Sequence, residues 1–289
     1  MSCDQAIADC LAARISPEVA VARMLLAGTA TEGIVAGLAR HRSDDARWAA
    51  MARLVEGRAA ALDRLAAEVQ ATGAQHDASG DEGVARIAAF FDRAVAHSPE
   101  ASVALYSLGD PAILAQATAE IIGWLEAHAL LRPDADVLDL GCGIGRVAAA
   151  LAPRCRSVLG LDVSAGMVAE ARRRNAALGN VRFEQTAGRD LDALPGAAFD
   201  LVLAIDSFPY IVQAGVQAGH SLVDRHVEGA ARVLRPGGAL AVLNFSYRGD
   251  KAADCADAVA LAGAHGLTLE QAGAAPFSVW DGTAFVLRR

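Results

Sequence analysis

The chain has 289 residues, of which 54% are hydrophobic, and its formal net charge is −8. This length suits one large domain or two unequal ones, and the apolar content is ample for a core. The acidic balance and the lack of a basic run argue against an extended nucleic-acid surface. Five cysteines without a C-x-x-C pair argue against a disulfide framework and against a structural metal site.

The sequence shows no targeting or membrane-spanning pattern. The N-terminus has no basic segment followed by a long apolar core, so we expect no signal peptide. No uncharged apolar run reaches the roughly 18 residues that a membrane helix needs, so we expect no membrane contact. These observations favour a cytoplasmic protein.

Residues 1–75 are expected to form an all-helical N-terminal domain. Ser16 followed by Pro17 is typical of a helix start, and Ser43 is expected to cap a longer helix. One interpretation is a small bundle that packs on the second domain or forms a homodimer, and the other is a cap that selects the substrate. The expected helices cover residues 4–15, 17–28, 31–41 and 44–72.

A linker is expected at residues 73–82, and a second domain at residues 83–289. Two helices are expected before its first strand, at residues 83–97 and 111–129. Three aromatic residues of this region are either ordinary core residues or parts of a lid over a ligand: Phe90, Phe91 and Tyr106.

Residues 137–146 read V-L-D-L-G-C-G-I-G-R, a buried strand that runs into a glycine cluster. The glycines permit a tight turn and let a ligand lie against the backbone. A helix is expected from residue 147, with its N-terminus toward that ligand. The three glycines are Gly141, Gly143 and Gly145.

Asp139 lies two residues before the first glycine, where a carboxylate repels a phosphate and attracts a cationic amino group. A dinucleotide-binding turn reads G-x-G-x-x-G, and Arg146 occupies its third glycine position. The observed spacing resembles motif I of the class I S-adenosylmethionine-dependent methyltransferases. This resemblance implies that Asp139 and the glycine loop hold the methionine end of the cofactor. Cys142, inside the loop, is expected to be a small residue beside the cofactor rather than a nucleophile.

A second strand is expected from residue 158, and it ends in Asp162, 21 residues after Gly141. An acidic residue at this place can accept hydrogen bonds from ribose hydroxyls, a feature that both nucleotide-binding folds share. Val163, the next residue, is also expected to contact the cofactor. Ser164 is expected to cap a helix over residues 165–177, in which Met167 either packs on the adenine or belongs to the core.

Later segments fit the same family in the same order. A third strand is expected at residues 181–185, and the resemblance places the following loop along the adenine, through Gly188, Arg189 or Asp190. Residues 199–206 resemble motif IV, a strand that leads into the catalytic loop and brings Ile205 to the cofactor. The L-R-P-G-G sequence at 234–238 resembles the turn before a fifth strand at 239–245.

The resemblance covers about residues 83–289. It implies an α/β, doubly wound, mostly parallel seven-stranded Rossmann-like sheet, preceded by the helical domain. A sixth strand is expected at 267–272. Residues 277–280 and 283–287 flank Asp281-Gly282, which favours a hairpin with an antiparallel last strand.

The loop after the fourth strand is the expected acceptor site, because open α/β sheets bind ligands at the carboxyl ends of their strands. Asp206 or Tyr210 orients the acceptor or takes its proton, and Asp206 alternatively caps the next turn. Asn244 and Tyr247, with Tyr106, are expected to border the pocket. His226, on the helix before the fifth strand, is expected at the surface.

The resulting hypothesis is methyl transfer from S-adenosylmethionine to a nitrogen or oxygen atom of a small molecule by in-line displacement. The N-P-P-Y sequence of many enzymes that methylate nucleic acids and proteins is absent, which favours a small acceptor. Two alternatives stay open: a nicotinamide-dependent oxidoreductase, and a non-catalytic module that uses the cofactor pocket for interaction.

Overall fold

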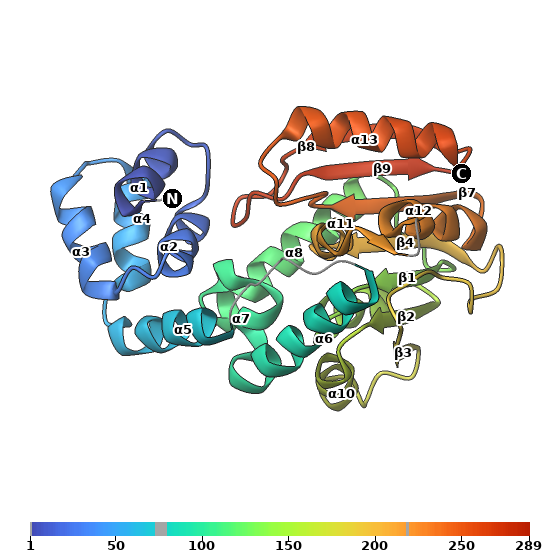
Figure 1. Cartoon of the computed structure of the whole chain (residues 1–289), viewed down its shortest axis with the longest axis horizontal. Coiled ribbons are helices and arrows are strands. Elements are labelled where there is room, and N and C mark those ends of the chain that lie inside the picture. Colours follow the sequence, from blue (N-terminus) through green and yellow to red (C-terminus); the bar gives the residue numbers. More distant parts are fainter. Residues whose placement is uncertain (1, 73–79, 218–219) are drawn as a thin grey trace. The chain divides into compact units, whose positions relative to one another are not determined.

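The computed structural model describes residues 2–72, 80–217 and 220–289, and its contacts divide the chain into two compact units (Figure 1). Unit 1 combines residues 1–74 with two later segments, 93–120 and 277–281, and unit 2 holds the remaining residues. The two units therefore differ from the expected domains 1–75 and 83–289, because unit 1 also includes two segments from later in the sequence. Most of the expected linker lies outside the described residues, and its last three residues, 80–82, are helical.

Unit 1 is helical, as expected for the N-terminal region. Its α2 contacts α1, α4 and α5 and buries Met24 and Leu25 completely among them. The predicted start of α2 is confirmed, because the Ser16 hydroxyl accepts from the Val19 amide and Pro17 follows in the first turn. The helices are α1 (Cys3–Leu11), α2 (Pro17–Leu26), α3 (Thr31–Arg40), α4 (Ala46–Val55), α5 (Ala59–Thr72), α7 (Pro99–Val103), the 3₁₀ turn Leu105–Ser107, and parts of α6 (Gly80–His97) and α8 (Pro111–Ala127).

The expectation of a single long helix over residues 44–72 is wrong, because two helices, α4 and α5, occupy this range. Gly57 adopts a φ of 67° just after α4, a left-handed conformation that commonly ends helices at glycine. Asp45, not Ser43, caps α4, because its carboxylate accepts from the Arg47 amide at 2.7 Å. One glycine among many apolar positions was too weak a signal to divide the helix.

Unit 2 contains a seven-stranded sheet with the strand order β3-β2-β1-β4-β7-β9-β8. β9 is antiparallel to both of its neighbours, and the other neighbouring pairs are parallel. The expected doubly wound, mostly parallel sheet with an antiparallel last strand is therefore confirmed. The strands are β1 (Asp136–Leu140), β2 (Ser157–Asp162), β3 (Val181–Gln185), β4 (Phe199–Ile205), β7 (Leu234–Leu243), β8 (Thr268–Ala274) and β9 (Ala284–Arg288).

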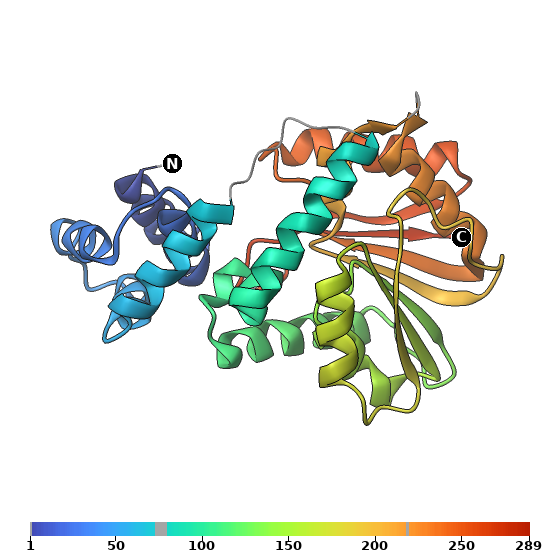
Figure 2. The same ribbon diagram turned by 60° about the horizontal axis from the view of Figure 1, so that its bottom comes forward.

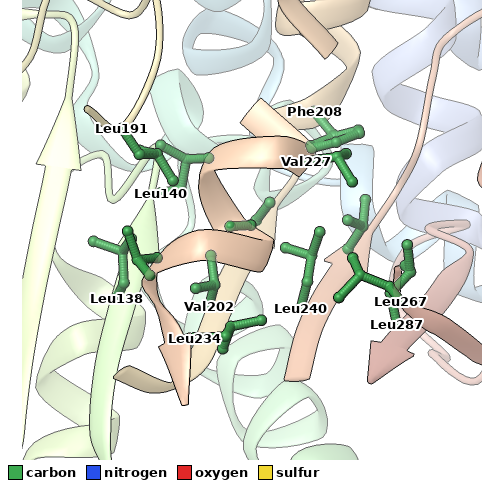
Figure 3. Close-up of a cluster of buried hydrophobic side chains, with 14 of the residues drawn as sticks. Leu138, Leu140, Leu191, Val202, Phe208, Val227, Leu234, Leu240, Leu267 and Leu287 are labelled. Carbon is green, nitrogen blue, oxygen red and sulfur yellow. The ribbon is translucent and has the colours of Figure 1, made fainter. Parts of the chain in front are cut away.

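Helices cover both faces of this sheet (Figure 2). α12 and α13 cover one face, which Leu138 and Leu140 of β1 share with Val202 of β4 (Figure 3). Because side chains alternate along a strand, Asp139 points to the opposite face from its two leucine neighbours. Besides the remaining parts of α6 and α8, the helices of unit 2 are α9 (Arg146–Leu151), α10 (Ala165–Arg174), α11 (Phe208–Ala214), α12 (Leu222–Val233), α13 (Lys251–Ala264) and the 3₁₀ turn Ala152–Arg154. A short strand, β5 (Val216–Gln217), pairs with β6 (His220–Ser221).

Two expectations near the C-terminus are corrected. β8 and β9 do pair antiparallel, but residues 277–280 form no strand, so the tight hairpin at Asp281-Gly282 is wrong. This segment packs within unit 1 instead, where the Ser16 hydroxyl donates to the Val279 carbonyl at 2.8 Å. The L-R-P-G-G sequence lies inside β7 as an irregularity of its register with β4 rather than before the strand.

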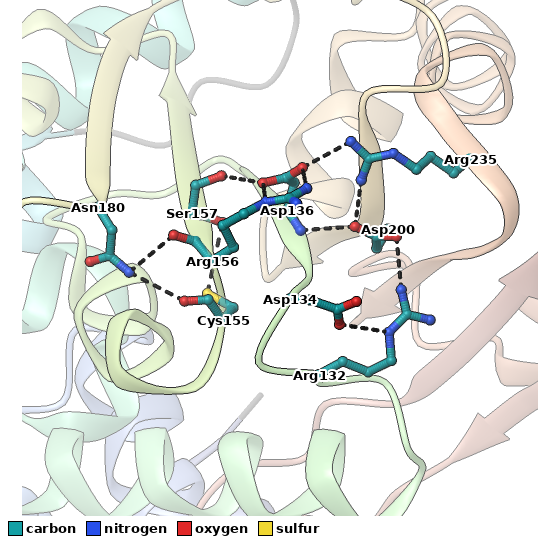
Figure 4. Close-up of polar contacts among 9 residues, drawn as sticks. All are labelled: Arg132, Asp134, Asp136, Cys155, Arg156, Ser157, Asn180, Asp200 and Arg235. Atoms are coloured by element: carbon teal, nitrogen blue, oxygen red, sulfur yellow. Dashed lines mark hydrogen bonds and ion pairs between the residues drawn. The ribbon is translucent and has the colours of Figure 1, made fainter.

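A charged network joins the amino ends of the central strands (Figure 4). Asp136 of β1 accepts from Arg156, Ser157 and Arg235. Asp200 of β4 accepts from Arg235 and Arg132 and from the Asp136 amide. The hydrogen bonds from Arg156, Ser157 and Arg235 hold the pKa of Asp136 well below its ordinary value. This edge is therefore tied together by charge-assisted hydrogen bonds, which leaves the carboxyl edge to bind ligands.

We expect Asp136→Asn to lower the free energy of unfolding at pH 7 by about 2 kcal/mol, because hydrogen bonds to charged groups contribute roughly 1.5–3 kcal/mol. A carboxyl whose pKa is lower in the folded state than in the unfolded state stabilises the fold at pH values above the unfolded-state pKa, which is near 4. This stabilisation is lost as the pH falls from there toward the folded-state pKa. The difference between parent and variant in denaturant unfolding should therefore shrink below pH 4. Asp134→Asn, at a 77% exposed side chain beside Arg132, is the matched control and should change little. Equal losses in both variants would contradict this account.

Candidate functional site

The glycine loop between β1 and α9 contains three left-handed residues. Gly141, Gly143 and Gly145 have φ angles of 77°, 52° and 75°, which residues with a side chain adopt only under strain. The Gly141 and Cys142 amides both donate to the Leu161 carbonyl, at 2.8 and 2.9 Å. The loop is thus fastened to the end of β2, and the expected turn is present.

Two of these glycines also permit close packing inside the protein. A Cβ on Gly141 would lie 2.3 Å from the Cβ of Ser207, which follows β4. A Cβ on Gly145 would lie 2.6 Å from the ring of Phe183, on β3. Gly141 and Gly145 therefore make room for Ser207 and Phe183, and the expectation that the glycines also let a ligand lie against the loop stays a prediction.

Asp139, on β1 just before this loop, is a buried acidic side chain. It is 2% exposed, and its Oδ2 atom has no hydrogen-bond partner among the described residues. Burial raises its pKa to about 7, against the opposing effect of the positive charge of Arg146. A buried carboxylate oxygen without a partner is costly, so such an atom favours a cationic hydrogen-bond donor beside it.

Asp162, at the end of β2, is bound to the loop itself. Its Oδ2 accepts from the Gly143 amide and its Oδ1 from the Ser164 amide, both at 2.9 Å. Each carboxylate oxygen has a second lone pair, so hydroxyl groups of a ribose can still donate to it. Burial raises the pKa of Asp162, and these backbone hydrogen bonds act in the opposite direction. The sequence did not reveal that Asp162 also holds the glycine loop in place.

We expect Asp162→Ala to weaken binding of S-adenosylhomocysteine by more than tenfold, because the variant loses both the hydroxyl acceptor and the two hydrogen bonds that fix the loop, about 1–3 kcal/mol for the hydroxyl acceptor alone. Calorimetric titration measures this change. The control is Asp192→Ala, at an exposed position of the neighbouring loop after β3. An affinity unchanged by Asp162→Ala would show that the end of β2 does not face the cofactor.

Cys142 fills the space over Gly160 of β2. A Cβ on Gly160 would lie 2.9 Å from the Cys142 sulfur. Burial, together with the charges of Asp139 and Asp162, raises the pKa of the Cys142 thiol well above its ordinary value. The thiol is therefore protonated, and this position suits a small packed residue rather than a nucleophile.

The loop after β3 lies against the first half of α6, within unit 2. A Cβ on Gly188 would lie 2.5 Å from Val163 and 3.0 Å from Val84 of α6. Arg189 donates to Asp81 of α6 at 2.8 Å, and its side chain is 52% exposed. Asp190 accepts from the backbone two residues later. These contacts bring Gly188 and Val163 together and direct Arg189 to α6.

Asp92 of α6 was not identified from the sequence. It accepts from the Ser164 hydroxyl at 2.6 Å and from the Gly166 amide at 2.8 Å, at the start of α10. The expected cap is confirmed, because the Ser164 hydroxyl also accepts from the Met167 amide. Nothing in the sequence connects Asp92 with a residue 72 positions later. Met167 is buried at 1% exposure, which leaves its contact with an adenine a prediction.

The carboxyl ends of β4 and β7 carry the expected acceptor residues. Asp206 and Asn244 both adopt left-handed φ angles, 55° and 73°. The Asn244 amide group donates to Asp206 Oδ1 at 2.6 Å, and the Tyr247 hydroxyl donates to the same oxygen at 2.9 Å. The ring of Tyr210 lies edge-on to that of Tyr247, at 5.6 Å between centroids. The structure therefore brings these four residues together, next to the buried Ile205.

Tyr106 and His226 were also singled out from the sequence. Tyr106 belongs to unit 1, where it is 8% exposed and stacks on Trp280 at 5.7 Å between centroids, so its role in the pocket stays a prediction. His226 was expected at the surface, and this is wrong, because it is 3% exposed on α12. Its ring contacts the Leu222 carbonyl at 2.7 Å, and burial lowers its pKa.

Comparison with known proteins identifies the domain that carries the glycine loop. Residues 137–238 match the family model of a methyltransferase domain. This segment is therefore similar to methyltransferase domains, in agreement with its resemblance to the class I S-adenosylmethionine-dependent methyltransferases. The cofactor of this family is S-adenosylmethionine, which disfavours the nicotinamide-dependent alternative.

The similar proteins differ in their activities. Trans-aconitate 2-methyltransferase from Deinococcus radiodurans is 40% identical over 116 residues, which cover 38% of each chain. An S-adenosyl-L-methionine-dependent Diels-Alderase from Talaromyces variabilis is 30% identical over 139 residues, or 47% of this chain and 43% of the relative. The chain thus matches only about two fifths of the length of these relatives.

Among solved structures, magnesium protoporphyrin IX methyltransferase from Synechocystis PCC 6803 has a TM-score of 0.53 at 19% identity. The match covers 72% of this chain and 97% of that structure, and it shows a shared fold. Within the described ranges, no helix is both long and apolar enough to span a bilayer. Over the same ranges, no three His, Cys, Asp or Glu side chains are grouped as metal ligands.

Proposed function

We propose that the chain transfers the methyl group of S-adenosylmethionine to a small molecule. The observation that carries this proposal is Asp139, a fully buried carboxylate with an unpartnered oxygen next to a left-handed glycine loop. The ammonium group of an amino acid is the donor that this oxygen lacks. A pyrophosphate would instead add negative charge beside a buried carboxylate.

The surrounding residues fit the rest of the cofactor. The charge of Arg146 acts on Asp139, so the loop offers both signs of charge to a zwitterionic amino acid. Asp162 offers lone pairs for the ribose, and Val163 and Gly188 lie together beyond it. Met167, Arg189, Asp190 and Ile205 are proposed to complete the cofactor site on the family's pattern.

When bound, S-adenosylmethionine supplies a methyl carbon that is already activated by its sulfonium. The residues of the chain then have to align the acceptor and remove its proton where it carries one. Burial and the nearby charge of Asp206 raise the pKa of Tyr210, so its hydroxyl stays a neutral donor. We therefore assign proton removal to Asp206 and acceptor orientation to Tyr210, with Asn244 and Tyr247 holding Asp206. A homodimer through residues 1–75 and a cytoplasmic location stay predictions.

The test is calorimetric titration of the full chain with S-adenosylhomocysteine and, separately, with NAD. We expect one molecule of S-adenosylhomocysteine to bind and NAD not to bind. Binding of NAD alone would contradict the proposal. Formation of S-adenosylhomocysteine from S-adenosylmethionine in the presence of an acceptor panel then tests turnover.

The relative named as a Diels-Alderase shows that such a domain also occurs in an enzyme that is not named as a methyltransferase. The second candidate is therefore a protein that binds the cofactor without transferring its methyl group. Binding of S-adenosylmethionine without formation of S-adenosylhomocysteine across the panel would favour it.

A further inference from the structure

The residues after β4 connect the acceptor site directly to the glycine loop. Ser207 donates to the Leu140 carbonyl at 2.6 Å, and its Cβ packs on Gly141. Asp206, the preceding residue, is held in a left-handed conformation, and its amide donates to the Leu243 carbonyl at 2.8 Å. Asp206 is therefore next in sequence to a residue that contacts the glycine loop, and this loop is proposed to hold the cofactor.

Two neutral groups hydrogen-bond to the carboxylate of Asp206. Asn244 and Tyr247 both donate to Oδ1, so these two donors orient the carboxylate and bring no positive charge to it. Asn244 is itself fixed, because its left-handed backbone donates to the Thr283 carbonyl at 2.7 Å. Two strained residues facing each other across two strand ends are typical of a functional site.

Three aromatic rings form a series of edge-on contacts that ends at Tyr247, whose hydroxyl donates to this carboxylate. Phe91 of α6 lies edge-on to Tyr210 at 5.0 Å and 77°, and Tyr210 lies edge-on to Tyr247 at 5.6 Å and 85°. Tyr247 is 48% exposed, so a ligand can reach its ring from solvent. Burial raises the pKa of Tyr210, and the negative charge of Asp206 raises it further.

We propose that Asp206, together with the rings of Phe91, Tyr210 and Tyr247, binds the ammonium group of an amine, so that the methyl acceptor is an amine rather than a carboxylic acid. A carboxylate attracts a cation, and the faces of aromatic rings add to this attraction. The same arrangement repels an anion. This inference rests on the proposed function, because it names the acceptor class of the same site. The bound ammonium group gives one N–H proton to the Asp206 carboxylate, which leaves a neutral amine whose nitrogen lone pair can attack the methyl carbon.

The test uses three probes of nearly equal shape that differ in charge: choline, 3,3-dimethylbutan-1-ol and 3,3-dimethylbutanoate. Each is titrated into the full chain saturated with S-adenosylhomocysteine. We expect choline to bind about tenfold more tightly than the neutral alcohol, and the anion to bind most weakly. Equal binding of choline and the alcohol, preference for the anion, or no binding of choline would overturn the inference.

Two variants assign the preference to these residues. Asp206→Asn should weaken choline binding about tenfold and leave the alcohol unchanged. Phe91→Leu removes one ring without touching the carboxylate and should produce a smaller loss for choline alone. If Asp206→Asn does not fold, Phe91→Leu still decides. Both variants should bind S-adenosylhomocysteine like the parent, and a parent that does not bind it refutes the proposed function instead.

Discussion

Replacing Asp139 by asparagine should weaken binding of S-adenosylhomocysteine about 100-fold at pH 8. The variant keeps the shape of the side chain but loses the charge that pairs with the ammonium group, and hydrogen bonds between charged groups contribute roughly 1.5–3 kcal/mol. Because the pKa of Asp139 is about 7, the affinity of the parent should rise between pH 6 and 7.5 as the proton leaves. The variant should show no such rise in calorimetry.

The same substitution should stabilise the protein without cofactor. The folded-state pKa of Asp139 is about 7, above the unfolded value near 3.9, so the unfolded chain binds fewer protons between these values and stability falls as the pH rises. The full cost above pH 7 is about 4 kcal/mol, from roughly 1.4 kcal/mol per pKa unit. Asp139→Asn should recover up to about this amount at pH 8 and almost nothing at pH 4.

Asp136 and Asp139 therefore give opposite results on one strand. Asp136→Asn should destabilise the chain, because its charge is used by three donors. Asp139→Asn should stabilise it, because Oδ2 has no partner. Denaturant unfolding of both variants at pH 4 and pH 8 separates them. If Asp139→Asn destabilises the protein at pH 8, the buried carboxylate has a partner inside the fold and is not reserved for a ligand.

Gly141→Ala should lower the free energy of unfolding by about 2–5 kcal/mol and abolish cofactor binding. Its left-handed φ of 77° costs an L-residue roughly 1–2 kcal/mol. The clash with Ser207 adds about 1–3 kcal/mol of overpacking. Gly237→Ala is the control for the first contribution, because Gly237 has a φ of 80° and no atoms within 4 Å of a Cβ.

A second substitution isolates the clash. Ser207→Gly removes the atom that a Cβ on Gly141 would meet, so Gly141→Ala should cost less in the Ser207→Gly protein than in the parent. The double-mutant cycle should show a coupling of about 1–3 kcal/mol. No coupling would mean that the glycine loop and the β4 end move apart, and the link between cofactor and acceptor sites would fail.

Patterns confined to short stretches of sequence predicted the structure well. β3 has the bounds expected for the third strand, and the glycine loop has its left-handed turns. The sheet with its antiparallel last strand followed from the family resemblance. These features depend on neighbouring residues or on a whole ordered set of motifs, and both are visible in a sequence.

Features that depend on distant residues could not be found. The contact of Asp92 with Ser164 spans 72 positions, and that of Arg235 with Asp136 spans 99. The burial of His226 depends on what packs on α12, and the segment after β8 packs within unit 1 instead of forming a hairpin strand. Asp136 and Asp139 are the same residue type on one strand. Only the folded structure shows that Asp136 accepts from three side chains, whereas one oxygen of Asp139 has no partner among the described residues.

The most direct measurement is a crystal structure of the chain with S-adenosylhomocysteine. We expect the amino group of its homocysteine part within hydrogen-bond distance of Asp139 Oδ2, and the ribose hydroxyls at Asp162. An empty glycine loop in the presence of excess ligand, or a ligand whose amino group lies away from Asp139, would contradict the account.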